Sequence, residues 1–474
     1  MSHKAILTFG ALALAWPAQG LADITASQLW DIWQGDGALS MRAAEVEMRR
    51  DGLSLMGVTV GLGDGDTRGT FLIERLDMTD TDAATVEIAV PDPVRFTGAG
   101  LPEMAALIVD YSEAEITADR SGARISYALD APQIAVELSG GGAQVSALDY
   151  VLEDVTAALE AGARLDQPLS VQSSVARVDG TIETSAREGQ TGGSRVSFTA
   201  TELQGTMAAD RPDQLVGGDP SSVLADFETS TSFTDLELQI DGDSPQGPVT
   251  AEVNLGAGQI ASAATGGVLT SDVDTRDIVI GTTGGRMPAM PDALSIGTLA
   301  YSLTLPVAAD QDGPLSLSLT ADAIAPAETL WSLLDPGKEL PRDPASLTLS
   351  LSAIARPSAE PGPGLGAQSP FDIRSFELQE LDLSVLGAQV TGSGQVDQPL
   401  DQRAAEGQVT LVATGLLELI GTLAALGILP PEQELGARMG LAFATVPLPG
   451  GAGLKTELVF GPDGAIRLNG MQVR

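Results

Sequence analysis

The chain has 474 residues, of which 64 are acidic and 25 are basic, and its formal net charge is −39. It has no cysteine and a single histidine, His3, which lies in the leader described below. After the leader, these counts exclude a Ser-His-Asp triad, a thiolate nucleophile, a His- or Cys-ligated zinc site and a structural disulfide. Hydrophobic residues make up 43%, which is enough for a folded core. The negative charge repels phosphates and excludes nucleic acid as a partner; otherwise it fits an acidic surface that keeps a protein soluble.

Residues 1–22 have the pattern of a secretory signal peptide. Lys4 gives a positive start, Ala5 to Trp16 form an uncharged apolar run, and small residues precede the bond between Ala22 and Asp23. We expect cleavage at that bond and a periplasmic product. The alternative is an uncleaved membrane anchor, but the run of about a dozen residues falls short of the roughly 20 that a span needs. No cysteine follows the run, so a lipoprotein is excluded, and we expect no transmembrane span in the mature chain.

A short helix is predicted directly after the leader, from Ser27 to Trp33, with Ser27 as its cap. Trp30 and Trp33 are three residues apart, so they share one face of this helix. We expect the pair to fasten the helix to a sheet; an aromatic platform for a sugar is the alternative.

Strict alternation of apolar and polar residues recurs along the whole chain, and it is typical of antiparallel strands with one apolar and one wet face. Clusters of Gly, Asp and Pro separate these runs and predict turns. We therefore expect a mainly β protein of about 25 strands, forming long antiparallel meander sheets that are curved or folded on themselves as a groove or sandwich, with a few short capping helices. The clearest apolar sets are Leu236, Leu238 and Ile240; Leu315, Leu317 and Leu319; Leu347, Leu349 and Leu351; and Phe376 with Leu378.

Two turns begin like calcium loops but lack the required ligands. The turn that starts at Asp64 places Arg75 where a bidentate Glu is needed, and the turn that starts at Asp241 has Pro245 at a ligand position. We expect no metal site and no cofactor, and we interpret these aspartates as turn residues.

Short helices are also predicted at 220–227 and 325–335. The segment 143–162 has helical propensity but lies among strands, and we favour a strand there. A stretch dense in Pro and Gly, residues 355–370, predicts a linker or loop between a β-rich region (23–354) and a C-terminal region of β-hairpins with a helical pair (371–474). A weaker break falls at 211–220, and both breaks are also compatible with loops inside one sheet.

The longest helical candidate, residues 413–445, is divided by Pro430 and Pro431 into two helices. Its first half, Leu416 to Leu429, is apolar nearly all round, with Glu418 as the one charge. About 14 residues are too few to cross a bilayer, so we favour a buried helix over a membrane-inserting hairpin. We expect this helix to plug the apolar face of the C-terminal sheet through Leu416, Ile420 and Leu423.

The C-terminal stretch carries a resemblance to a known family. The segments `LDLSVLGAQVTGSGQVD` (381–397), `GQVTLVATGLLELIGTLAALGILPPEQ` (407–433) and `LKTELVFGPDGAIRLNGMQV` (454–473) follow one another, and `LWDIW` (29–33) follows the leader. This order resembles the Domain of Unknown Function 2125 family of alphaproteobacterial exported proteins, which implies no catalytic motif. The closing hairpin `FGPDGAIRLNG` (460–470) also resembles AsmA-like envelope proteins, and that resemblance implies long curved sheets with apolar grooves for lipids.

Paired carboxylates are the one catalytic chemistry that the composition leaves open, but aromatic residues, which sugar clefts use, are only 4%. We therefore expect a non-enzymatic periplasmic protein, with no catalytic residues, that binds or handles apolar envelope molecules such as lipids. The alternative is a structural protein of the envelope whose apolar faces pack against each other or against another envelope protein. A carboxylate glycosidase is the third hypothesis. The short helices cannot cover so many strands, which favours an open apolar surface or a sheet folded on itself.

Overall fold

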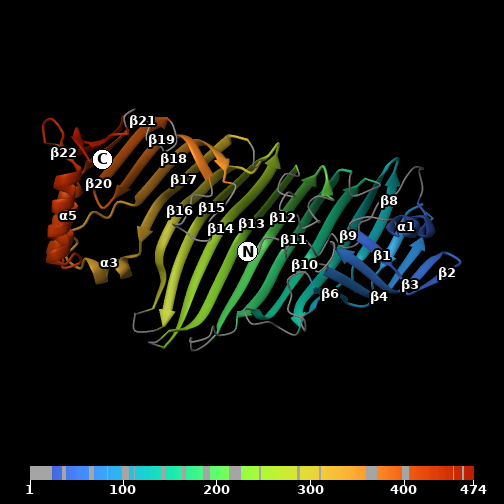
Figure 1. Cartoon of the computed structure of the whole chain (residues 1–474). Helices are drawn as coiled ribbons and strands as arrows, with labels where there is room; N and C mark the ends of the chain where they lie inside the picture. Colours follow the sequence, from blue (N-terminus) through green and yellow to red (C-terminus); the bar gives the residue numbers. More distant parts are fainter. Residues whose placement is uncertain are drawn as a thin grey trace. The chain divides into compact units, whose positions relative to one another are not determined.

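The computed structural model describes residues 24–34, 39–62, 69–82, 84–98, 106–111, 113–139, 145–162, 167–184, 193–212, 226–244, 247–284, 289–308, 311–358, 371–397, 405–451, 453–461 and 464–473. Within these residues the chain forms 25 strands and four short α-helices (Figure 1), which confirms the mainly β prediction. The strands pair in antiparallel fashion, mostly with their neighbours in sequence. The signal-peptide prediction, with its cleavage bond between Ala22 and Asp23, lies outside the described residues.

The chain divides into two compact units. Unit 1 comprises Met1–Thr265 and Thr283–Met287, and unit 2 comprises Gly266–Thr282 and Pro288–Arg474. Within unit 2, the strands on either side of the Pro/Gly-rich stretch pair with each other along most of their length.

Unit 1 begins with a helix and a network of short strands and continues into a meander of long strands. In the network, β3 pairs with β1, β2 and β4, whereas β9 pairs with β7, β8 and β10. Its elements are α1 (Ala26–Trp33), β1 (Leu39–Arg42), β2 (Glu45–Arg49), β3 (Gly52–Leu62), β4 (Gly69–Asp80), β5 (Val86–Ala89), β6 (Val94–Gly98), β7 (Ala106–Asp110), β8 (Glu115–Ser121), β9 (Arg124–Ser139), β10 (Val145–Ala161), β11 (Leu169–Thr184), β12 (Ser194–Ala209), β13 (Phe227–Ser244) and β14 (Gly247–Thr265).

The predicted first helix is confirmed, and both tryptophans fasten it to the sheet. Trp33 is fully buried and its indole Nε1 donates to the Tyr127 hydroxyl at 3.1 Å, and Trp30 is buried beside it. The predicted cap was wrong: Thr25 caps the helix. Its hydroxyl accepts the backbone N–H of Gln28 at 3.3 Å, and the Gln28 side chain accepts the Thr25 N–H at 3.0 Å. This reciprocal capping box needs a Gln or Glu three residues after the cap, and Ser27 does not have one.

Many of the long strands contain one residue in the left-handed backbone region near their middle. In unit 1 these residues are Asp154, Glu202 and Asp235, and in unit 2 they are Asp277 and Ala323, with φ between 47° and 54°. The ladders skip each of these positions. Three of the partner residues that they skip are small: Ala176 opposite Asp154 and Glu202, Gly256 opposite Asp235, and Gly297 opposite Asp277.

At most of these bends both paired strands skip one residue at the same level, so the register is kept. The skipped residue shifts the alternation of its own strand by one position. Without this shift, the second half of each strand would turn its polar side chains to the apolar face. In β10 the apolar side chains before the bend are Leu148, Tyr150 and Leu152, and those after it are Val155, Ala157 and Leu159.

Unit 2 is an antiparallel meander with three of the four helices. Its elements are β15 (Val268–Gly284, through Thr282), β16 (Met290–Pro306), β17 (Gly313–Pro326), α3 (Glu328–Leu334), β18 (Ala345–Pro357), β19 (Phe371–Val385), β20 (Ala388–Asp397), β21 (Glu406–Thr414), α4 (Leu416–Ala425), α5 (Pro431–Ala444), β22 (Val446–Pro447), β23 (Leu454–Phe460), β24 (Ile466–Leu468) and β25 (Met471–Gln472).

The remaining helix predictions have mixed outcomes. The helix at 325–335 is confirmed as α3, the strand at 143–162 as β10, and the division at Pro430-Pro431 as α4 and α5. The helix predicted to Leu429 ends earlier, at Ala425, because Gly427 adopts φ 74° and closes the last turn. Residues 220–225 lie outside the described part. In that part, no helix is long and apolar enough to cross a membrane.

Candidate functional site

The register of unit 2 aligns the predicted leucines into rows that run across its strands. The central row follows cross-strand partners from β15 to β23, so its side chains lie on one face of the sheet. Two shorter rows flank it in β16–β19. The central row is Val273, Tyr301, Leu319, Leu349, Leu381, Gly392, Leu411 and Thr456; the flanking rows are Leu303, Leu317, Leu351 and Leu378, and Leu299, Ala321, Leu347 and Leu383. We call these residues the apolar rows.

The apolar rows are only half covered. Every residue of the central row is half-buried, and in the flanking rows only Ala321 and Leu378 are buried. By contrast, the core cluster of buried side chains among the described residues comes from unit 1. An apolar face that is left half exposed over this many strands marks a surface where a ligand or partner can bind.

The opposite face of the same strands is polar. Between the leucines of β17 and β18 lie Ser316, Ser318, Ser350 and Ser352, and the hydroxyl of Ser350 donates to Gln379 Oε1 at 2.8 Å. The two faces therefore differ in chemistry, although both are partly exposed.

The three residues predicted to plug this sheet lie on α4. Ile420 is buried with 8% of its surface exposed, whereas Leu416 and Leu423 are half-buried. The helix packs against α5 and contacts β20. That this helix plugs the apolar face remains a prediction.

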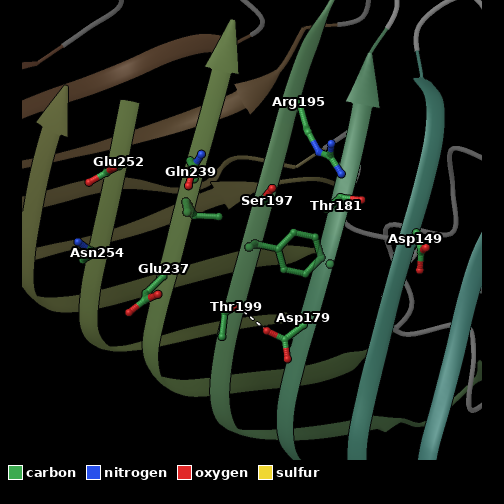
Figure 2. A pocket seen from close by; sticks show the side chains of 13 residues that line it. Asp149, Asp179, Thr181, Arg195, Ser197, Thr199, Glu237, Gln239, Glu252 and Asn254 are labelled. Carbon is green, nitrogen blue, oxygen red and sulfur yellow. Dashed lines mark hydrogen bonds between the residues drawn. The ribbon is translucent and has the colours of Figure 1, made fainter. Parts of the chain in front are cut away.

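A polar concavity of about 730 Å³ lies on unit 1, across β10 to β14. Figure 2 shows its labelled side chains, which come from neighbouring strands of one sheet. Four carboxylates line it, Asp149, Asp179, Glu237 and Glu252, and Arg195 is the one basic residue among its lining residues. The carboxylates project from the same sheet face: Asp179 and Glu237 both neighbour Thr199, one from each side.

Hydrogen bonds hold Asp179 in its charged form. Its carboxylate accepts from Arg177 in bidentate fashion, with Nη2–Oδ1 at 2.6 Å, and from the Thr199 hydroxyl at 2.6 Å. The Arg177 hydrogen bonds are the main reason that the pKa of Asp179 lies below its ordinary value; burial opposes them and Thr199 adds to them. A glycosidase needs a carboxylic acid with a raised pKa facing a second carboxylate across the substrate. The lowered pKa of Asp179 does not fit this acid role.

The calcium-like turn that starts at Asp241 has its first carboxylate occupied by neighbours. Asp241 accepts from the Thr250 hydroxyl at 2.6 Å and from the Gln239 amide at 3.0 Å. The first five residues of the other such turn, 64–68, lie outside the described residues. The prediction that neither turn holds a metal is not tested by these contacts.

A scan against models of known families, a search of curated proteins and a search of solved structures found no match to the chain. The resemblances in the C-terminal stretch therefore stay predictions.

Proposed function

We propose that this protein is a non-enzymatic binder of lipid acyl chains in the periplasm, and that the apolar rows of unit 2 are its binding surface. The observation that carries the proposal is the central row, whose side chains continue across eight strands and are half-buried throughout. The periplasmic location rests on the signal-peptide pattern alone.

The chemistry of the rows suits an alkyl chain. Apart from Tyr301 and Thr456, the central row has no side chain that donates or accepts a hydrogen bond. Binding along it is therefore non-directional and follows the apolar area removed from water. A sugar or peptide would leave its own polar groups without partners on such a surface, and that costs free energy.

The dimensions suit the same ligand. Eight neighbouring strands, about 4.8 Å apart, give the central row a length of about 34 Å. An acyl chain spans about half of a hydrocarbon core that is about 30 Å thick, so a whole chain can lie along the row.

The structural alternative requires the apolar faces to be covered by the protein itself. The first part of unit 1 shows what such a core is like, because apolar side chains from α1 to β12 form one buried cluster. The half-buried state of the rows in unit 2 favours a surface that is used for binding.

Two measurements test the proposal on the mature chain purified after export. Mass spectrometry of organic extracts should find co-purified lipid, and the neutral probe N-phenyl-1-naphthylamine should brighten on binding and be displaced by palmitate. Leu349→Glu places a charge on the central row and should weaken probe binding at least tenfold. Ser350→Glu, its neighbour on the polar face, should leave binding unchanged.

A milder variant separates binding from folding. Leu349→Thr removes apolar area and adds a hydroxyl without adding a charge, so it should weaken probe binding severalfold while the circular dichroism spectrum stays that of the wild type. A protein that carries no lipid and binds the probe equally well in all three variants would refute the proposal.

A further inference from the structure

Helix α5 of unit 2 presents a stripe of large apolar side chains to solvent. Leu435, Met439 and Phe443 are 62%, 64% and 62% exposed. They are four residues apart, so they lie one above the other on the same side of the helix. No residue of α5 is buried. An isolated exposed leucine needs no explanation, but a three-residue stripe on one helix does.

Two glycines lie directly beside this stripe and leave open notches. A Cβ atom placed on Gly436 or on Gly440 would meet nothing within 4 Å outside the helix itself. Each glycine is also next in sequence to a large apolar residue, Leu435 or Met439. Large and small residues therefore alternate along one helix face.

We propose that this face binds the same face of a second copy of the chain, in an antiparallel helix pair with a two-fold axis between Met439 and Gly440. That register places Met439 on Gly440 of the second copy, Phe443 on Gly436 of the second copy, and Leu435 on Ala444 of the second copy. Every large side chain meets a small one, and the two-fold symmetry repeats each contact. Small residues let two helices approach closely, and this self-complementarity is what a two-fold interface requires.

The charges on α5 favour a second helix over a membrane surface. Helices that lie on membranes carry Lys and Arg beside their apolar face. Here the flanking charges are Glu432 and Glu434, and Arg438 is engaged with Glu434 at 2.8 Å. The antiparallel arrangement also keeps the acidic first turns of the two copies apart, whereas a parallel pair would bring them together.

The available area sets the strength of the association. Val446 lies two residues after the last residue of α5 and is 40% exposed. The Asn469 side chain donates to the Ala444 carbonyl, and Met471, two residues further along the chain, is 52% exposed. A large side chain buries on the order of 200 Å² when it is fully covered. The three stripe residues and these two neighbours are 40% to 64% exposed, so together they offer on the order of 500 Å² per copy. Two copies would then bury about 1,000 Å², the lower limit for a specific interface. We therefore expect a weak, concentration-dependent dimer.

Sedimentation velocity of the mature chain, from about 1 to 100 μM, tests the proposal. The wild type should shift from monomer to dimer across this range. Gly440→Leu fills the notch and Met439→Glu places a charge at the axis, so both should stay monomeric. Leucine also has a higher helix propensity than glycine, so Gly440→Leu does not weaken the helix itself. The matched control is Gly242→Leu, at another glycine with open space around it; it should dimerise as the wild type does.

Disulfide mapping tests the register, because the chain has no cysteine of its own. A mixture of Met439→Cys and Gly440→Cys chains should cross-link under mild oxidation faster than either chain with Gly242→Cys. A mixture that cross-links no faster than that control would overturn the register.

Two sedimentation results would overturn the proposal as a whole: a wild type that stays monomeric at about 100 μM, or a Gly440→Leu variant that dimerises normally. A flotation result would also overturn it, namely a wild type that floats with phosphatidylcholine vesicles and a Gly440→Leu variant that floats more strongly. The last result would assign the stripe to a membrane surface.

Discussion

The part of unit 1 from α1 to β12 and the meander of unit 2 are built from the same alternating strands, yet their apolar faces are buried to different extents. In unit 1, Leu55, Ile73 and Leu76 have no exposed surface, and α1 covers part of that face with Trp33. In unit 2, Leu319 and its row neighbours are half-buried. Alternation therefore specifies which residues share a face, whereas the cover of that face depends on what packs above it. A strand pattern alone therefore does not distinguish a buried core from a half-exposed apolar face.

The largest expected effect contrasts the two faces directly. Leu55→Ala in unit 1 should lower the free energy of unfolding by about 2–5 kcal/mol, because it leaves a cavity in a buried core. Leu349→Ala in unit 2 should cost about 1 kcal/mol, since much of its surface is already in contact with water. Hydrogen exchange read by mass spectrometry, peptide by peptide, measures the two units separately. Equal losses in the free energy of unfolding from Leu55→Ala and Leu349→Ala would contradict the difference in burial between the two faces.

Unit 2 has a buried polar anchor in addition to its scattered buried side chains. Asp335 has no exposed surface; Oδ1 accepts the Glu339 N–H at 2.9 Å, and Oδ2 accepts the Leu340 N–H at 3.0 Å and Arg342 Nη2 at 3.3 Å. The Arg342 guanidinium lies 4.2 Å from the ring centre of Trp331. Burial raises the pKa of Asp335, but the two N–H groups and Arg342 outweigh it, and the net shift is below the ordinary value of 3.8.

Replacing this anchor should destabilise unit 2 in a pH-dependent way. A carboxyl whose pKa is lowered by folding stabilises the fold above its unfolded pKa and loses that contribution as the pH falls through the folded value. Asp335→Asn should therefore destabilise unit 2 fully above pH 5, and the difference from the wild type should narrow as the pH falls below 3.8. Hydrogen exchange at several pH values measures this difference. The exposed neighbour Asp343, changed to Asn, should have no such effect, and a pH-independent loss at Asp335 would argue against the role of its charge.

Much of the fold could be predicted from the sequence, because apolar and polar residues alternate so regularly. The leucines at 315–319 and 347–351 and the Pro430 break are local signals, and local signals indicate strands and helix ends directly. The apolar rows could not be predicted in the same way, because the register between β17 and β18 depends on turn geometry and on the bends. The bends themselves leave a trace: in β13, Phe233 and Leu236 are three residues apart where alternation requires two.

The capping box of α1 could also have been predicted from the sequence, since Thr25 and Gln28 have the required spacing. The half-buried state of the apolar rows could not be predicted from the sequence, because it depends on which elements pack above a face. The same limit applies to the polar concavity, whose carboxylates come from four strands between Asp149 and Glu252.

The cap offers a smaller test within unit 1. Thr25→Ala removes the hydroxyl that accepts the Gln28 N–H and should cost about 1 kcal/mol of stability in α1 and its contact strands. Ser27→Ala should be nearly neutral, because Ser27 is exposed within the helix. Thermal melts followed by tryptophan fluorescence report on this region through Trp30 and Trp33. A larger loss from Ser27→Ala than from Thr25→Ala would restore Ser27 as the cap.

The smallest expected effect concerns the bends, the feature that both units share. A residue other than glycine in the left-handed region costs on the order of 1 kcal/mol. Ala323, at φ 54°, lies in the bend of β17, where its Cβ packs close to Gly297. Ala323→Gly should therefore raise stability by up to about 1 kcal/mol, whereas Ala325→Gly in the same strand should lower it by about 0.5–1 kcal/mol. Glu202→Gly in unit 1 should act as Ala323→Gly does, because its φ of 50° places it in the same region. Hydrogen exchange in β12 and β17 would show whether the two units respond alike. Stabilisation in one unit only would mean that the bends are held by different contacts, and the units would then differ in their strands as well as in their cover.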